Sequence, residues 1–141
     1  MTGGGLCAAL TSVAGSSAVV RGGLITYATD LKVGLAGVDA ELIARHGVVS
    51  QPVAEAMAAA ARRLCGADWG LAVTGVAGPG ASDGVAAGTV WLGLAGAFGV
   101  AAQQLRLDGD RSAVRQATVA AALDWLGERL AASPQADTVV G

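Results

Sequence analysis

The stretch Leu71-Ala72-Val73-Thr74-Gly75-Val76-Ala77-Gly78-Pro79-Gly80 is an apolar run that ends abruptly in glycines. An aliphatic and β-branched run of this kind predicts a buried strand, which we place over residues 68–74. The glycines that follow allow a tight turn, because glycine has no Cβ to obstruct the backbone. Backbone N–H groups in such a turn can bind an anion such as phosphate. We interpret the stretch as a strand followed by a glycine turn. By itself this turn is more often a simple chain reversal, and a ligand-binding loop is the alternative.

Hydrophobic periodicity on both sides of this stretch predicts one α/β domain. The expected helices span residues 5–13, 29–36, 39–46, 51–65 and 111–132, and three further strands span residues 18–27, 88–95 and 100–107. The buried faces expected for the two long helices are Val53, Met57, Ala60, Ala61 and Leu64 in one, and Val114, Thr118, Ala121, Ala122, Trp125 and Leu126 in the other. The sequence therefore predicts a single mixed sheet covered by helices over residues 1–132, followed by a disordered tail over residues 133–141.

Composition and charge narrow the classes of function. The chain has 141 residues, of which 53% are hydrophobic and 14% are charged, and its formal net charge is −2. This length suits one domain with a buried core. Lys and Arg form no basic block, which argues against nucleic-acid binding. One His and two Cys offer neither a metal-ligand spacing nor a disulfide framework, so no metal is expected.

The uncharged run over residues 84–105 is long enough to span a bilayer. Glycines interrupt this run, however, and Gly96-Ala97-Phe98-Gly99 is typical of a turn. We therefore interpret the run as two adjacent strands rather than a transmembrane helix. Because no secretory signal is apparent after Met1, we expect a cytoplasmic protein that makes no membrane contact.

Three groups of residues are candidates for chemistry: Ser17 in a Gly-Ser-Ser turn, the pair Tyr27 and Lys32, and Thr74 beside the glycine loop. A lysine near a hydroxyl group can lower the pKa of that group, or can act as a base if it is itself desolvated. The ordinary alternative for Lys32 is a solvated surface position. His46 lies at the end of an expected helix and is expected to cap carbonyl groups or to pack locally.

Two arginines begin the last expected helix. Arg111 and Arg115 lie at the helix end where cations are unfavourable unless a negative group is nearby. Either a ligand phosphate or the carboxylates of Asp108 and Asp110 would explain them.

Taken together, these residues resemble the C-terminal domain family of the competence/damage-inducible protein CinA, whose stand-alone members are nicotinamide-nucleotide amidohydrolases. The resemblance covers residues 1 to about 130. The matching segments are Thr2-Gly3-Gly4, Gly15-Ser16-Ser17-Ala18, Arg21-Gly22, Thr26-Tyr27-Ala28, Lys32, Gly37-Val38, His46-Gly47 with Ser50, Thr74-Gly75-Val76-Ala77-Gly78-Pro79, Gly88-Thr89-Val90-Trp91, and Gly109-Asp110-Arg111 with Val114-Arg115.

The resemblance implies hydrolysis of the carboxamide of nicotinamide mononucleotide, without a metal or organic cofactor. For the residues that the resemblance places at the site, we hypothesise that Ser17 is the nucleophile or supports it, and that Tyr27 and Lys32 handle the proton. We further hypothesise a substrate-binding set in which Arg111 pairs with phosphate and the loop holds the oxyanion or phosphate. The residues of that set are Thr74, Gly75, Gly78, Arg111, Thr2 and Gly3.

The sequence also departs from the family pattern. Family members carry a helix, a strand and a Glu-Ser lead before the position of Met1, and the serine of that lead is a rival nucleophile. Val85-Ala86-Ala87 stands where many members have Lys-Pro-Val, which removes a cation from the loop. Because the strand before Met1 would belong to the sheet, we expect its absence to leave an uncovered sheet edge, which favours a homo-oligomer. The alternatives are a non-catalytic module that binds a nucleotide or a protein partner, and a purely structural domain.

Overall fold

The computed structural model of the chain describes residues 1–133. Apart from a strand predicted over residues 18–27, its helices and strands follow the predicted order and lie close to the predicted boundaries. They are α1 (Gly5–Thr11), the short 3-10 helix η1 (Ser16–Ala18), α2 (Thr29–Gly34), α3 (Ala40–His46), α4 (Gln51–Leu64), β1 (Gly70–Gly75), β2 (Thr89–Gly96), β3 (Gly99–Arg106) and α5 (Arg111–Ala131). The tail expected over residues 133–141 lies, apart from Ser133, outside the described residues.

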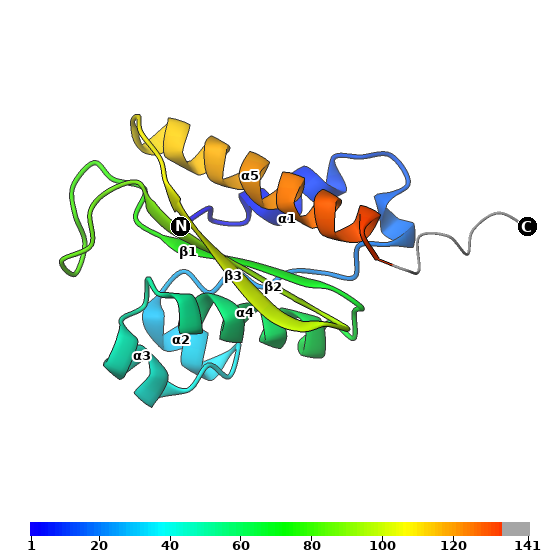
Figure 1. Cartoon of the computed structure of the whole chain (residues 1–141), viewed down its shortest axis with the longest axis horizontal. Coiled ribbons are helices and arrows are strands. Elements are labelled where there is room, and N and C mark those ends of the chain that lie inside the picture. Colours follow the sequence, from blue (N-terminus) through cyan, green and yellow to red (C-terminus); the bar gives the residue numbers. More distant parts are fainter. Residues whose placement is uncertain (134–141) are drawn as a thin grey trace, which may run out of the picture.

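The three strands form one sheet in the order β1-β2-β3. Helices α2, α3 and α4 lie on one side of this sheet, and α1 and α5 lie on the other (Figure 1). The predicted α/β class, with one sheet covered by helices, is confirmed. Both strand pairings are antiparallel, whereas a mixed sheet was expected. The difference arises because every strand that forms is joined to the next by a chain reversal, which makes neighbours antiparallel.

The strand predicted over residues 18–27 does not form. Residues 16–18 belong to η1, and residues 20–27 are neither helix nor strand. Residues 21–27 take part in none of the backbone–backbone hydrogen bonds found outside helices and strands in residues 1–133. A cavity of about 470 Å³, which we call the apolar groove, is lined both by this segment and by Gly70, Leu71, Ala72 and Val73 of β1. The segment is therefore not paired with β1, and the apolar groove is lined by both.

Helix α4 packs against the sheet through backbone contact at two glycines. A Cβ added to Gly93 of β2 would collide with the carbonyl oxygen of Ala54, and one added to Gly70 of β1 would collide with that of Ala58. Ala54 and Ala58 are fully buried, whereas the predicted core residue Leu64 is 47% exposed. The buried face of α4 is thus rotated from the predicted one, because glycines in the sheet accept alanines rather than larger side chains.

Helix α5 covers the opposite face of the sheet. Val114, Thr118 and Ala122 are buried, as predicted, and Val114 and Ala122 pack in one core cluster with Val90 and Leu92 of β2. The uncharged run over residues 84–105 folds largely into the β2–β3 hairpin. Within residues 1–133, no helix has the length and apolar character needed to cross a membrane.

Candidate active site

A second cavity, of about 560 Å³, opens where β1 ends. We call it the site cavity. Its walls come from five places in the sequence: Met1, residues 27–32 around the start of α2, residues 46–49 at the end of α3 and after it, residues 74–85 at the end of β1 and in the loop that follows, and the first residue of α5. In Figure 1 this loop projects at the left end of the molecule, beyond the sheet. The topology therefore brings distant, glycine-rich segments to one end of the sheet.

Lys32 is the only lysine in the chain and faces the site cavity from α2. Its side chain is buried, with 6% of the residue exposed, and its Nζ donates a hydrogen bond to the carbonyl oxygen of Thr26 at 2.7 Å. Burial lowers the pKa of Lys32, because the charged ammonium loses its hydration. A lysine in this state can release its proton and act as a base more readily than a solvated one.

Arg111 joins two walls of the site cavity. Its Nη2 donates to the Tyr27 hydroxyl oxygen at 2.8 Å, and its Nη1 donates to the carbonyl oxygen of Gly78 at 2.9 Å. The preceding residue, Asp110, caps α5 by accepting a hydrogen bond from the Ala113 N–H at 2.8 Å, which fixes the start of the helix. A guanidinium has five N–H donors, so Arg111 retains donors for a ligand while it holds Tyr27 against the loop.

Thr74 has a structural hydrogen bond in addition to its place on the cavity wall. Its hydroxyl donates to the carbonyl oxygen of Val48 at 2.8 Å, which holds the α3–α4 connection against the end of β1. A Cβ on Gly75 would lie 2.9 Å from the carbonyl oxygen of Thr89, and Gly78 has a φ of +99°. Both positions therefore favour glycine for steric or conformational reasons.

The loop after β1 also presents free backbone donors. The N–H groups of Ala77 and Gly78 take part in none of the hydrogen bonds found in the described part of the chain. Positively charged side chains near the cavity favour an anion, as these N–H donors do. Burial, followed by the charges of Lys32, Arg111 and Arg115, lowers the pKa of the Met1 α-amino group to about 6. An anionic ligand would therefore be stabilised in this cavity.

Three predicted site residues lie away from the site cavity. Thr2 and Gly3 line the apolar groove instead, and the Thr2 carbonyl oxygen accepts a hydrogen bond from Arg115 at 2.9 Å. That contact gives Arg115 a partner that is neither a phosphate nor a carboxylate. Ser17 is exposed and lines neither cavity.

Ser17 lies far from the site cavity because the chain turns in a short 3-10 helix after α1. The Ser16 N–H donates to the Val13 carbonyl oxygen and the Ala18 N–H donates to that of Gly15. This turn, drawn in blue in Figure 1, lies at the opposite end of the molecule from the loop after β1. The structure thus brings together Tyr27, Lys32, Thr74, Gly75, Gly78 and Arg111, but not Ser17.

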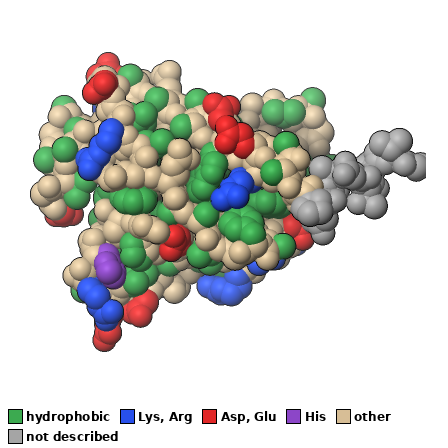
Figure 2. Space-filling model, viewed as in Figure 1, with side chains coloured by type: hydrophobic (Ala, Val, Ile, Leu, Met, Phe, Trp, Pro, Cys, Tyr) green, Lys and Arg blue, Asp and Glu red, His purple; other side chains and the backbone are tan. Residues whose placement is uncertain are grey.

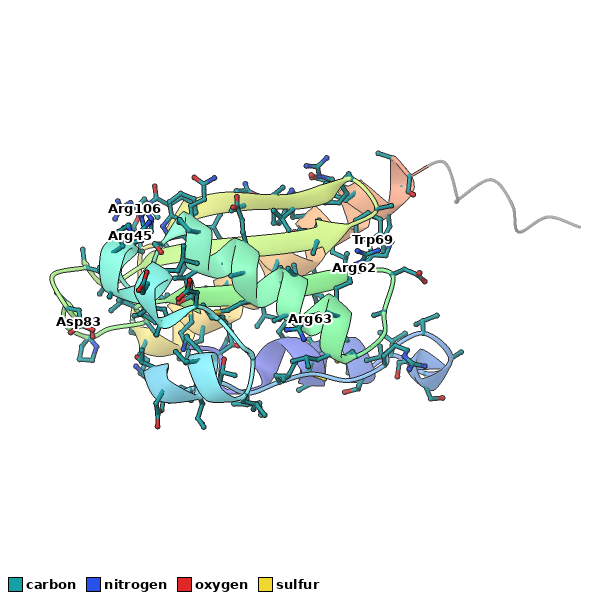
Figure 3. All side chains as sticks on the ribbon, turned by 90° about the horizontal axis from the view of Figure 1, so that it is seen from below. Arg45, Arg62, Arg63, Trp69, Asp83 and Arg106 are labelled. Carbon is teal, nitrogen blue, oxygen red and sulfur yellow. The ribbon has the colours of Figure 1, made fainter. Side chains whose placement is uncertain are left out.

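The cavity wall also contains residues that were not predicted to belong to the site. His46, Ser82 and Asp83 line it. Ser82 and Val85 exchange two backbone hydrogen bonds, and Asp83 at φ +49° and Gly84 at φ +75° form the turn between them. Asp-Gly is a strong signal for such a tight hairpin, so this part of the loop was predictable from sequence. Figure 3 shows Asp83 at the tip of the loop.

Cationic side chains outside the cavity are dispersed. On the face shown in Figure 2, Lys and Arg side chains occur in separate places among hydrophobic and polar surface. Residues 1–133 contain no group of three or more His, Cys, Asp or Glu side chains placed to hold a metal ion. The groups in the described residues that can favour an anion in this cavity are thus Arg111, the loop amides, and Lys32 when it is protonated.

The fold is an α/β domain with a glycine-lined cavity at one end of its sheet. The chain belongs to the CinA family, since the family model described as the CinA C-terminal domain matches residues 1–130. A CinA-like protein of Parasynechococcus marenigrum is 52% identical over 135 residues, and one of Frankia casuarinae is 45% identical over 137 residues. These matches cover 93% and 97% of this chain but 32% of each relative, so the chain spans about a third of their length.

Solved structures support the same assignment. A CinA superfamily protein from Klebsiella pneumoniae is 38% identical with a TM-score of 0.89, over 94% of this chain and 83% of that one. A competence/damage inducible protein from Agrobacterium tumefaciens is 41% identical with a TM-score of 0.84, over 89% of this chain and 78% of that one. The arrangement of helices around the sheet is therefore that of the CinA family.

Proposed function

We propose that the site cavity binds nicotinamide mononucleotide and hydrolyses its carboxamide, which yields nicotinic acid mononucleotide and ammonia. The observation that carries this proposal is Lys32, a buried lysine with a lowered pKa that faces a cationic, glycine-lined cavity. Amide hydrolysis needs a base that works near neutral pH, and desolvation is a general way to obtain one from lysine. The resemblance to nicotinamide-nucleotide amidohydrolases supplies the substrate.

The chemical step follows from the residues of the cavity. In the fraction of molecules in which it is deprotonated, Lys32 takes a proton from a water molecule, whose oxygen attacks the carboxamide carbon. Negative charge then develops on the carboxamide oxygen, where the free N–H groups of Ala77 and Gly78 stabilise it. The carbon–nitrogen bond breaks, Lys32 returns its proton to the leaving nitrogen, and ammonia is released. Water is the nucleophile in this proposal because Ser17 lines neither cavity.

The 5′-phosphate of the nucleotide requires a separate set of donors. Arg111 retains free guanidinium hydrogens beyond those bound to Tyr27 and Gly78, and it lies at the first turn of α5. The N-terminus of this 21-residue helix adds its own favourable interaction with an anion. Phosphate binding at this end of the cavity would leave the pyridine ring and its carboxamide directed towards Lys32.

The test is ammonia release from nicotinamide mononucleotide by the full chain and by two charge-matched variants. We expect Lys32→Met to reduce kcat at least about 100-fold, because it removes the base. Arg129→Met removes a cation about 27 Å along α5 from Arg111, at 1.5 Å per residue, and should leave the rate unchanged. Turnover by Lys32→Met at the wild-type rate would exclude the proposed mechanism.

A second candidate function is nucleotide binding without hydrolysis. The position of Ser17 outside both cavities favours it, since the predicted nucleophile is then missing from the site. Calorimetric titration with nicotinamide mononucleotide separates the two candidates. Binding by a folded protein that releases no ammonia would establish the non-catalytic module, and ammonia release that depends on Lys32 would exclude it.

A further inference from the structure

Residues 20–27, which we call the strap, have unused capacity for pairing. The backbone of residues 21–27 makes no hydrogen bond with another backbone group in the described part of the chain. The strap contains β-branched and aromatic residues that favour extended backbone, and one of them, Ile25, is 57% exposed. Such a segment gains hydrogen bonds and buried apolar surface if it pairs with a strand.

Strand β1 has a free edge that faces the strap. Gly96 and Gly99 flank the turn of the β2–β3 hairpin, so Gly96 directs its backbone groups to β3 and Ala95 directs its own to β1. By the same alternation, the backbone groups of Leu71 and Val73 point away from β2. Both residues line the apolar groove, as the strap does. Figure 3 shows the strap, in pale blue, beyond β1 on the side away from β2.

Side-chain hydrogen bonds hold the strap at both of its ends. Arg21 donates to a carbonyl oxygen in the turn between α4 and β1 at 2.8 Å. At the other end, Lys32 donates to the Thr26 carbonyl oxygen at 2.7 Å, and Arg111 donates to the Tyr27 hydroxyl at 2.8 Å. The strap therefore runs parallel to β1, because Arg21 lies near the start of β1 and Tyr27 lines the cavity at its end.

We propose that the strap closes onto β1 and that the structure shows its open state. In the closed state the strap pairs with the free edge of β1 and fills the apolar groove. Closure draws Thr26 and Tyr27 away from Lys32 and Arg111, since hydrogen bonds of 2.7 and 2.8 Å do not survive a movement across the groove. The site cavity then loses one wall, so that only the open state binds a ligand there.

Different contacts stabilise the two states. The closed state gains backbone hydrogen bonds and removes the apolar groove from water, whereas the open state keeps the side-chain hydrogen bonds at both ends of the strap. A ligand in the site cavity stabilises the open state alone and shifts the population towards it. This inference concerns the conformation of the chain and does not rest on the proposed hydrolysis.

A disulfide that fixes the open state tests the proposal. A Cβ on Gly23 would lie 3.2 Å from the Cβ of Cys7. Disulfides usually join Cβ atoms about 3.5–4.5 Å apart, so a small adjustment suffices. Gly23→Cys in a Cys65→Ser background should therefore form a disulfide with Cys7 on oxidation, which holds the strap against α1. Cys65→Ser alone is the matched control, because its one thiol forms no intramolecular disulfide.

Hydrogen exchange of the Leu71 and Val73 amides reports the position of the strap. In the wild-type chain and in the reduced variant, closure should protect these amides and those of the strap about tenfold, which corresponds to a closed fraction of about nine-tenths. Oxidation should remove this protection and reduction should restore it. The Ala72 amide, which faces β2, is the internal reference and should not change.

Arg21→Met gives an independent variant that needs no disulfide. It removes the hydrogen bond that holds one end of the strap open, so protection of the Leu71 and Val73 amides should rise about fivefold. Arg63→Met is the matched control, because its guanidinium also donates to a backbone carbonyl oxygen, but to one outside the strap. Protection that falls in Arg21→Met would contradict the proposal.

Binding at the site cavity should follow the position of the strap. A ligand that needs the open state binds with an apparent affinity reduced by the open fraction. The oxidised variant should therefore bind nicotinamide mononucleotide more tightly than the reduced one, by the same factor by which it loses protection, as measured by calorimetric titration. The exchange result decides the proposal whether or not this nucleotide is the ligand.

Two results would overturn the proposal. Leu71 and Val73 amides that exchange equally fast in the wild-type chain and in both forms of the variant would show that β1 keeps a free edge throughout. Protection of these amides that persists in the oxidised variant would show that a different segment or a different polypeptide pairs with β1.

Discussion

Lys32 has an environment that makes the stability of the protein depend on pH. Burial lowers its pKa in the folded state from the ordinary value of 10.5. Between the folded and the unfolded pKa, the unfolded chain binds the proton more strongly, so the free energy of unfolding rises with pH in this window. Below the window, the buried charge reduces stability by a constant amount.

Lys32→Met removes this dependence. We therefore expect the difference in free energy of unfolding, variant minus wild type, to decrease as the pH rises from 7 towards 10.5. Urea denaturation at a series of pH values measures this difference. A constant difference across the series would contradict the assignment of a lowered pKa to Lys32.

Arg111 is expected to act on catalysis by positioning Tyr27 as well as by charge. Lysine cannot bind both the Tyr27 hydroxyl and the Gly78 carbonyl in the geometry of a guanidinium. If the amidohydrolase proposal holds, Arg111→Lys should lower kcat by about 10- to 100-fold, both for nicotinamide mononucleotide and for nicotinamide riboside, which has no phosphate.

Comparison of the two substrates separates positioning from phosphate binding. An arginine that served only the phosphate would raise KM for the mononucleotide and leave the kinetics of the riboside unchanged. Tyr27→Phe provides the matching control, because it removes the hydroxyl that Arg111 contacts while keeping the ring.

At the scale of the elements, the contact between α4 and the sheet depends on glycine. Gly93→Ala would place a Cβ against the carbonyl oxygen of Ala54, and backbone on both sides leaves little room for adjustment. We expect a loss of about 1–3 kcal/mol in the free energy of unfolding, as for other over-packed cores. Chemical denaturation measures this loss.

Gly127→Ala is the matched control for this prediction. A Cβ at Gly127 meets nothing within 4 Å, and the residue lies inside α5. Because alanine favours the helix over glycine, we expect a gain of about 0.5–1 kcal/mol. Equal effects from the two substitutions would show that the loss of glycine's backbone freedom, and not the contact with α4, dominates at Gly93.

At the scale of the whole molecule, both helical layers share one three-stranded sheet and should unfold together. Val114 of α5 packs against β2, while α4 packs against the other face of the same strand. We expect Val114→Ala to cost about 2 kcal/mol and to shift the unfolding midpoints seen by tryptophan fluorescence and by far-UV circular dichroism equally. Separate midpoints would indicate that the two layers unfold independently.

The regular elements could be predicted well because their signals are local. The turn at Gly96–Gly99 separates two strands, and Asp39 and Asp110 cap the helices that follow them, as their sequence positions indicated. The strand expected over residues 18–27 was wrong for a non-local reason. A strand needs a hydrogen-bonded neighbour, and the apolar groove lies between this segment and β1.

In the candidate site, too, some features follow from local sequence signals and others depend on contacts between distant segments. The glycine loop was indicated by its own segment of sequence, and Lys32 was a candidate there, but the burial of Lys32 was not predicted and depends on packing. The contact between Arg111 and Tyr27 joins residues 84 positions apart, and no periodicity reports such a pair. The position of Ser17 is equally non-local, since a Gly-Ser-Ser turn has the same sequence whether it borders a cavity or faces solvent. The order and limits of most elements thus follow from short-range backbone preferences, while the membership of the site depends on how the packed layers bring distant segments together.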